Sequence, residues 1–120
     1  MLVGKRMTRN PLTVTEDTSV QEAEELMRKH KIRRMPVVRG EKLVGIVTEL
    51  DLLRVSPSAA TSLSIFELNY LLNRLKVKEA MTKNPHTVTP ETTLEEAALL
   101  MREKEVGALP VVENGKVVGI

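Results

Sequence analysis

The sequence contains no cysteine and very few aromatic residues, and both absences narrow what the protein can be. Without thiols, disulfide bonds and thiolate catalysis are excluded, and an intracellular location is the default expectation. Phe66 and Tyr70 are the only aromatic side chains among 120 residues. The core must therefore be aliphatic, and a platform of aromatic rings on which nucleic-acid bases could stack is missing.

Long apolar runs and catalytic motifs are also missing. No apolar stretch approaches the roughly 20 residues of a membrane span, and Met1–Arg6 lacks the apolar run of a secretion signal. We therefore expect a cytoplasmic protein without a membrane segment.

His30 and His86, the only histidines, do not have metal-site spacing, and no glycine-rich phosphate loop occurs. We predict that the chain is not an enzyme, has no metal site and requires no cofactor.

An internal repeat dominates what is present. Met7–Ile46 reappears at Met81–Ile120, shifted by 74 positions without a gap, and we call these segments the first and second copy. A duplicated unit indicates that the fold belongs to the pair. We therefore predict a first unit over residues 1–55, a linker and connecting helix over 56–75, and a second unit over 76–120.

Each copy has the pattern of an α/β (α+β) unit. Extended segments at 12–14 and 86–88 precede helices, which begin at the capping-box pairs Ser19/Glu22 and Thr93/Glu96. Two apolar strands follow, joined in the second copy by Asn-Gly, a strong hairpin signal. The first copy continues with a helix over 49–55, which gives the order β-α-β-β-α. The second copy stops at Ile120, so we expect a unit truncated before its last helix, with apolar surface exposed.

The segment between the copies has no counterpart in the repeat. A breaker-rich loop over 56–62 is followed by an amphipathic pattern over 63–72, which predicts a helix. This helix could serve packing or dimerisation, and a regulatory lever is the alternative.

The most informative short motif runs from Gly45 to Asp51. It predicts a strand, a tight turn and a helix that begins at Thr48, so that the Thr48 hydroxyl and the Asp51 carboxylate lie together at the helix N-terminus. Such an arrangement suits a ribose, with a phosphate near the helix amides. The alternative is an ordinary capping box without any ligand.

These features together resemble a tandem cystathionine-β-synthase (CBS) domain pair, also called a Bateman module. The resemblance rests on the duplication, the Met-Thr-x-Asn-Pro openings, the Pro-Val-Val strands and the Gly-x-Val-Thr-x-x-Asp turn, and covers nearly the whole chain. The linker is similar to that of acetoin-utilisation-type CBS proteins. The resemblance implies two units related by a pseudo-twofold axis, with clefts between them that bind adenosine-containing ligands.

The resemblance also implies roles for individual residues. Asp51 matches the ribose-binding carboxylate and Thr48 its partner, while Ile46 contacts the adenine. Arg33 contacts phosphate, and Arg34 could assist or remain a solvated surface charge. The opposite wall of this cleft is assigned to Val88, Thr89 and Pro90. In the second copy Gly107-Ala108 replaces Arg33-Arg34, so the other cleft, which Val14, Thr15 and Glu16 could line, is expected to be incomplete.

We therefore predict a regulatory module that senses AMP, ADP, ATP or S-adenosylmethionine, forms a homodimer and acts on an unknown protein partner. A structural dimerisation module without ligand is one alternative. Nucleic-acid binding through the basic cluster Lys29–Arg34 is another, and the small net charge of +2 argues against it.

Overall fold

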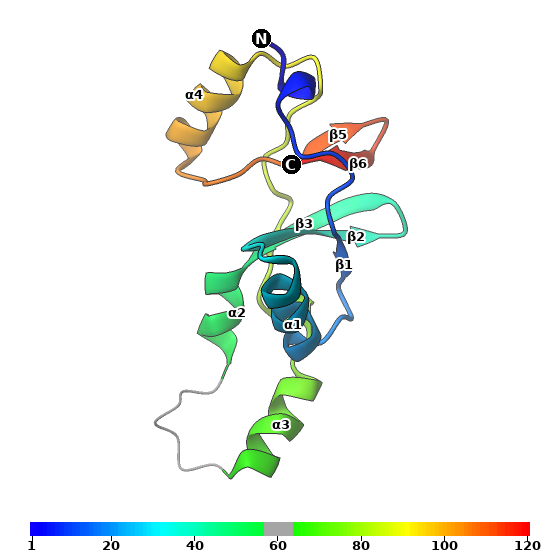
Figure 1. Cartoon of the computed structure of the whole chain (residues 1–120), viewed down its shortest axis with the longest axis vertical. Coiled ribbons are helices and arrows are strands. Elements are labelled where there is room, and N and C mark those ends of the chain that lie inside the picture. The colour runs from blue at the N-terminus through cyan, green and yellow to red at the C-terminus, as the bar shows by residue number, and fades with distance from the viewer. Residues whose placement is uncertain (57–63) are drawn as a thin grey trace.

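The computed structural model describes residues 1–56 and 64–120 (Figure 1). Most of the predicted loop and the first residue of the predicted linker helix lie outside these residues. The elements in chain order are η1 (Val3–Lys5), β1 (Val14–Thr15), α1 (Val20–His30), β2 (Arg34–Arg39), β3 (Lys42–Thr48), α2 (Glu49–Val55), α3 (Ile65–Arg74), η2 (Val77–Glu79), β4 (Thr82–Lys83), α4 (Leu94–Lys104), β5 (Val111–Glu113) and β6 (Lys116–Gly119).

The two repeated helices begin where the sequence predicts. The Ser19 hydroxyl accepts the amide of Glu22 at 3.0 Å, and the Thr93 hydroxyl accepts the amide of Glu96 at 3.1 Å. Each bond satisfies one of the amides that a helix leaves without an internal partner. The predicted starts of α1 and α4 are therefore confirmed.

The strands form one path in the order β1-β2-β3-β6-β5, with β4 paired to β3. Both hairpins are confirmed, and in the second one Asn114 and Gly115 have the positive φ angles that a tight turn requires. The sheets of the two copies meet where Lys42 of β3 pairs with Lys116 of β6. At the same place the Lys116 ammonium lies 2.9 Å from the Glu41 carboxylate. This hydrogen bond and the charge of Glu41 raise the pKa of Lys116.

The predicted extended segments are shorter than expected. β1 contains only Val14 and Thr15. In the second copy Val88 forms a single parallel bridge with Val111, and a strand that the sequence did not predict, β4, lies earlier in the chain. The residues before Val14 and Val88 cross toward the other copy, so they cannot continue the ladder with their own hairpin.

Each copy receives a short segment from the other. The Val3 and Gly4 amides donate to the carbonyls of Thr92 and Pro90, at 2.7 and 2.9 Å. In the equivalent exchange, the Val77 and Lys78 amides donate to the carbonyls of Thr18 and Glu16, at 2.8 and 3.1 Å. Figure 1 shows the N-terminal segment lying beside α4, far from the rest of the first copy. The exchange extends the structural repeat beyond the part that is visible in the sequence.

The aliphatic core accordingly has two clusters, each completed by a residue from outside its own copy. Val77 is fully buried in the cluster of the first copy, which includes Met35 and Leu52. Val3 is buried in the cluster of the second copy with Leu109 and Val111. Burying an aliphatic side chain stabilises the fold by about 1.5–3 kcal/mol. The two copies are therefore tied together by their cores.

The linker helix α3 packs against α1 and leaves its aromatic residues outside. Phe66 is 85% exposed, and the Arg74 guanidinium lies 4.5 Å from the centre of the Tyr70 ring. The prediction of a helix after the loop is confirmed, with the helix beginning at Ile65. None of the helices in the described residues is long and apolar enough to cross a membrane.

Candidate ligand-binding site

The predicted turn folds as a complete capping box. The Thr48 amide donates to Asp51 Oδ2 at 2.9 Å, and the Asp51 amide donates to the Thr48 hydroxyl at 3.1 Å. Both side chains are half-buried. The capping box, which both interpretations of the motif include, is therefore formed, and it uses one carboxylate oxygen. Within residues 1–56 and 64–120, the other oxygen, Oδ1, makes no hydrogen bond.

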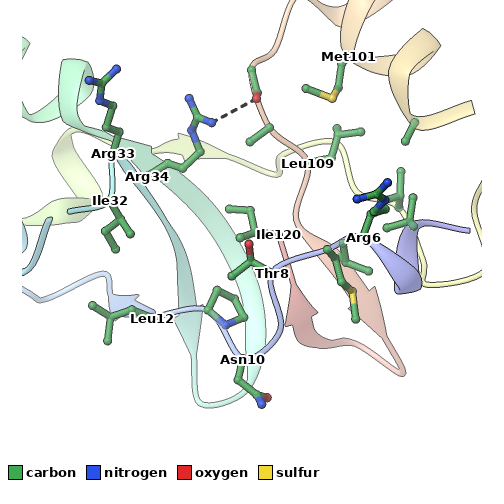
Figure 2. A pocket seen from close by; sticks show the side chains of 18 of the residues that line it. Arg6, Thr8, Asn10, Leu12, Ile32, Arg33, Arg34, Met101, Leu109 and Ile120 are labelled. Carbon is green, nitrogen blue, oxygen red and sulfur yellow. Dashed lines mark hydrogen bonds between the residues drawn. The ribbon is translucent and has the colours of Figure 1, made fainter. Parts of the chain in front are cut away.

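A cavity of about 1010 Å³ lies between the two copies (Figure 2). Segments from both copies line it, and Thr8 and Ile120 form its base by exchanging backbone hydrogen bonds of 3.0 and 3.1 Å. Its lining residues are Val3, Arg6, Met7, Thr8, Asn10, Pro11, Leu12, Thr13, His30, Ile32, Arg33, Arg34, Val88, Leu94, Ala97, Met101, Gly107, Ala108, Leu109, Val111 and Ile120. The volume is sufficient for a nucleotide-sized ligand.

The polar part of the lining is basic. Arg33 and Arg34 come from the start of the first hairpin, and Arg6 comes from the N-terminal segment that crosses to the second copy. Neither aspartate nor glutamate lines this cavity in the part of the chain that the structure describes. Figure 2 shows Arg34 extended toward the second copy, whereas Arg33 points away from it. Arginine binds phosphate with a planar fork of donors, so the cavity is suited to an anionic group.

The apolar part of the lining includes the core face of the second copy. Leu94 and Met101 of α4 are partly exposed there, whereas their counterparts in the first copy, Val20 and Met27, are buried. In the first copy α2 packs against α1, and its Leu52 is fully buried. Leu94 and Met101 therefore form part of one apolar wall of the cavity.

The structure separates the predicted site residues into three groups. Arg33 and Val88 line the large cavity. Pro90 lines a second cavity of about 390 Å³ with Arg9 and Glu113. The remaining predicted residues line neither cavity, and these are Ile46, Thr48, Asp51 and Thr89. The same holds for the residues proposed for the other cleft, Val14, Thr15 and Glu16.

The capped turn nevertheless adjoins the basic edge of the cavity. Thr48 pairs with Arg34 across the first hairpin, and the Glu49 amide donates to the Arg33 carbonyl at 2.8 Å. The backbone therefore places Arg33 beside the turn that carries Asp51. Ile46 and Ile120 are equivalent in the repeat, because Ile46 pairs with Thr82 and Ile120 pairs in the same way with Thr8. The turn that follows Ile46 is therefore related by the repeat to the side of the cavity at Ile120.

Sequence reasoning missed several lining residues. Arg6 and Thr8 enter the cavity only because the N-terminal segment crosses to the second copy. One signal could have found Thr8, since Met7-Thr8 and Met81-Thr82 are equivalent in the repeat. No such signal exists for Arg6, because Ala80 stands at its position in the repeat. Among the described residues no group of side chains is arranged to hold a metal ion.

Comparison with known proteins identifies the class. The family model named CBS domain matches residues 3–58 and 77–120, and the chain belongs to this family as a tandem pair. The chain is 42% identical over 113 residues to an inosine-5'-monophosphate dehydrogenase of Korarchaeum cryptofilum, covering 93% of this chain and 21% of that enzyme. It is 36% identical over 121 residues to a homoserine O-acetyltransferase of Methanococcus vannielii, covering 99% and 23%. The chain thus spans about a fifth of these relatives.

Solved structures share the whole architecture, which confirms the predicted fold class of two CBS units. A putative acetoin utilization protein from Vibrio cholerae superposes with a TM-score of 0.82 at 31% identity, covering 99% of this chain and 82% of that one. CBSX2 in complex with AMP gives 0.81 at 35% identity, covering 98% and 88%. The CBS domain pair of protein MJ0100, in complex with 5'-methylthioadenosine and S-adenosyl-L-methionine, gives 0.79 at 27% identity, covering 99% and 86%.

Proposed function

We propose that this CBS pair is a regulatory module that binds an adenosine-containing ligand between its two copies. The observation that carries the proposal is the cavity at their junction, with apolar walls suited to a base and arginines suited to a phosphate. Two structural neighbours, CBSX2 and MJ0100, hold AMP or S-adenosyl-L-methionine. Their bound molecules support the ligand class without deciding which member this chain takes.

The charge of the cavity favours phosphorylated ligands within that class. Among the residues that the structure describes, no carboxylate joins Arg6, Arg33 and Arg34 in the lining. Such a site attracts the phosphates of AMP, ADP or ATP, and it repels the sulfonium of S-adenosylmethionine. We therefore place the adenine nucleotides ahead of S-adenosylmethionine.

The first test is a thermal-shift screen of AMP, ADP, ATP, S-adenosylmethionine and adenosine on the whole chain. A ligand present at about 100 times its dissociation constant should stabilise the fold by about 2.7 kcal/mol. A chain of this size should then melt several degrees higher. We expect the largest shift from a nucleotide. The absence of a shift with every compound would instead favour a structural dimerisation module.

Asp51 is proposed as a ribose contact through its second carboxylate oxygen, for a ligand that extends from the cavity past its Arg33 edge to the capped turn. Thr48, Ile46, Thr89 and Pro90 do not line this cavity, and their contacts to the ligand stay predictions from the resemblance. Asp51→Asn separates this role from capping, because an asparagine oxygen can still accept the Thr48 amide, while the charge is lost. We expect AMP affinity to fall by about tenfold or more, since a charged hydrogen bond contributes about 1.5–3 kcal/mol. Calorimetry with AMP measures this loss, and the melting temperature without ligand should change little.

The affinity of Asp51→Asn for AMP also tests the alternative in which Asp51 is only a helix cap. Unchanged AMP affinity in Asp51→Asn would mean that Asp51 only caps α2. Thr93→Ala is the matched control, because it removes an equivalent cap from α4 and touches no proposed ligand contact. It should lower stability by about 1 kcal/mol without a change in AMP affinity.

The regulatory mechanism that we propose is a population shift. A ligand that contacts both copies favours the arrangement in which they lie closest, and a partner protein recognises that arrangement. The chain itself is proposed to act as a non-enzymatic homodimer. Leu50 and Leu53 support self-association, because they are 54% and 58% exposed on one face of α2. The cytoplasmic location expected from the cysteine-free composition stays a prediction.

A further inference from the structure

Methionine carries all the sulfur of this protein, because the chain has no cysteine. Oxidation at sulfur is therefore restricted to the formation of methionine sulfoxide. The six side chains differ in burial: Met27 and Met35 are buried, Met1 is 64% exposed, and Met7, Met81 and Met101 are half-buried. The half-buried methionines combine a role in packing with access to an oxidant.

Met7 packs directly on a glycine of the second copy. A Cβ built on Gly119 would overlap the Met7 sulfur and lie 2.9 Å from its Cγ. Met81 packs in the same way on Gly45, where a built Cβ would lie 2.7 Å from the sulfur. Each sulfur therefore occupies the space of the missing side chain, and no room remains for a further atom between sulfur and glycine.

The surroundings distinguish these two repeat-related methionines. Met7 lines both the cavity of about 1010 Å³ and the cavity of about 390 Å³. A molecule as small as hydrogen peroxide can therefore reach its side chain from two sides. Met81 lines neither cavity and packs against the core cluster of the first copy. Because an oxidant must reach the sulfur, Met7 should react faster than Met81.

The reaction with peroxide transfers one oxygen atom. A lone pair of the methionine sulfur attacks a peroxide oxygen, an S–O bond forms, the O–O bond breaks, and the departing oxygen takes up a proton and leaves as water. Sulfur loses two electrons and peroxide gains them. The product is a polar, chiral sulfoxide in place of an apolar thioether. Such a group no longer fits against the backbone of Gly119.

The residue after Met7 carries a contact between the copies. Thr8 and Ile120 exchange backbone hydrogen bonds of 3.0 and 3.1 Å, and Figure 2 shows Thr8 beside Ile120 at the base of the large cavity. A sulfoxide at Met7 must either leave Gly119 or push this backbone away from β6. Apolar packing between the copies is lost in both cases.

We propose that Met7 is a site of oxidative modification, and that its sulfoxide weakens the contact of the N-terminal segment with the second copy. The reagent is a small two-electron oxidant of the hydrogen peroxide class. The modification is reversible, because methionine sulfoxide is reduced enzymatically. This role of Met7 is independent of ligand binding, since it depends on packing against Gly119 and on access from the cavities.

The first measurement is the rate at which each methionine of the whole chain is oxidised. The chain is treated with hydrogen peroxide, and mass spectrometry of proteolytic peptides follows the addition of oxygen with time. We expect Met7 to react several times faster than Met81, while Met27 and Met35 stay reduced in the folded chain. Oxidation of Met81 at the rate of Met7 would overturn the proposal.

The second measurement is the melting temperature before and after this treatment. All chains carry Met101→Leu, which removes the other methionine that lines the large cavity. Met7→Leu keeps an apolar side chain of similar volume that peroxide does not oxidise, and Met81→Leu is the matched control. We expect peroxide to lower the melting temperature by several degrees in the chain with Met7 and in Met81→Leu, but by less than about one degree in Met7→Leu. An equal fall in Met7→Leu would contradict the role of Met7.

Two further results keep the test independent of how well Met7→Leu folds. Met7→Gln places a polar group against Gly119 without any oxidant, so it should melt several degrees below Met7→Leu. Equal melting temperatures would show that this contact tolerates a polar group, which the proposal excludes. In the oxidised chain, methionine sulfoxide reductases for both epimers should restore the original melting temperature. A loss that persists after Met7 is reduced would assign the effect to another residue.

Discussion

Replacing Leu52 with alanine should lower the free energy of unfolding by about 2–5 kcal/mol. Leu52 is fully buried and belongs to the cluster that contains Met35 and Val77. Truncation removes apolar contacts and leaves a cavity between α2 and the sheet, because a packed core relaxes only in part. Chemical denaturation measures the loss of unfolding free energy. The slope of this free energy against denaturant concentration is compared between the variants.

Leu53→Ala is the control for this prediction. Leu53 neighbours Leu52 in α2, yet it is 58% exposed, so its truncation should change the stability of the folded chain by no more than about 0.5 kcal/mol. Equal losses for the two variants would contradict the placement of α2. A loss in Leu53→Ala that grows with protein concentration would instead report self-association through this face.

Gly45→Ala should destabilise the protein by about 1–3 kcal/mol, although it adds a single methyl group. A Cβ at this position would lie 2.7 Å from the Met81 sulfur and 2.9 Å from the Thr82 carbonyl oxygen. The methionine can move, but the Thr82 carbonyl belongs to β4, which pairs with β3 at this glycine. The strand that leads into the second copy must therefore shift. Thermal denaturation should show a fall of several degrees.

Gly107→Ala is the matched control, since its Cβ would meet only the end of the flexible Arg34 side chain, at 3.4 Å. Its melting temperature should stay within about two degrees of that of the unsubstituted chain.

Gly119 is the repeat counterpart of Gly45, and a Cβ there would press on Met7. Gly119→Ala should therefore behave like Gly45→Ala. A neutral result for both would contradict the crossing of segments between the copies.

These close approaches explain why the pair folds as a unit. Met81 and Thr82 cross Gly45, and Met7 and Thr8 cross Gly119, each coming from the other copy. The amides of Val3 and Val77 continue the same exchange. The two copies therefore share their cores.

Local features were predictable from the sequence because they depend on neighbouring residues. Ser19 and Thr93 begin helices through a hydroxyl that bonds an amide three residues later. Asn114-Gly115 supplies the two positive φ angles of its turn. Capping at Thr48 and Asp51 follows from the same spacing, and the proposed ribose contact is the part that spacing alone does not decide.

Contacts between the copies were not predictable in the same way. β4 forms only because Gly45 lets another backbone approach, and the sequence around Thr82 carries no strand pattern of its own. Arg6 and Arg33 are far apart in the chain, and only the crossing of the N-terminal segment brings both to one cavity.

The sequence by itself determined that there are two copies, the elements within each copy and the family to which they belong, because repetition and capping are local patterns. Only the tertiary structure decided that each copy is completed by a valine from outside it, that the large cavity lies beside Ile120, and that Arg34 reaches Gly107. The physical reason is that packing between distant segments depends on their shape and on the available space, as at Gly45 and Gly107. Shape and available space do not follow from the spacing of residues along the chain.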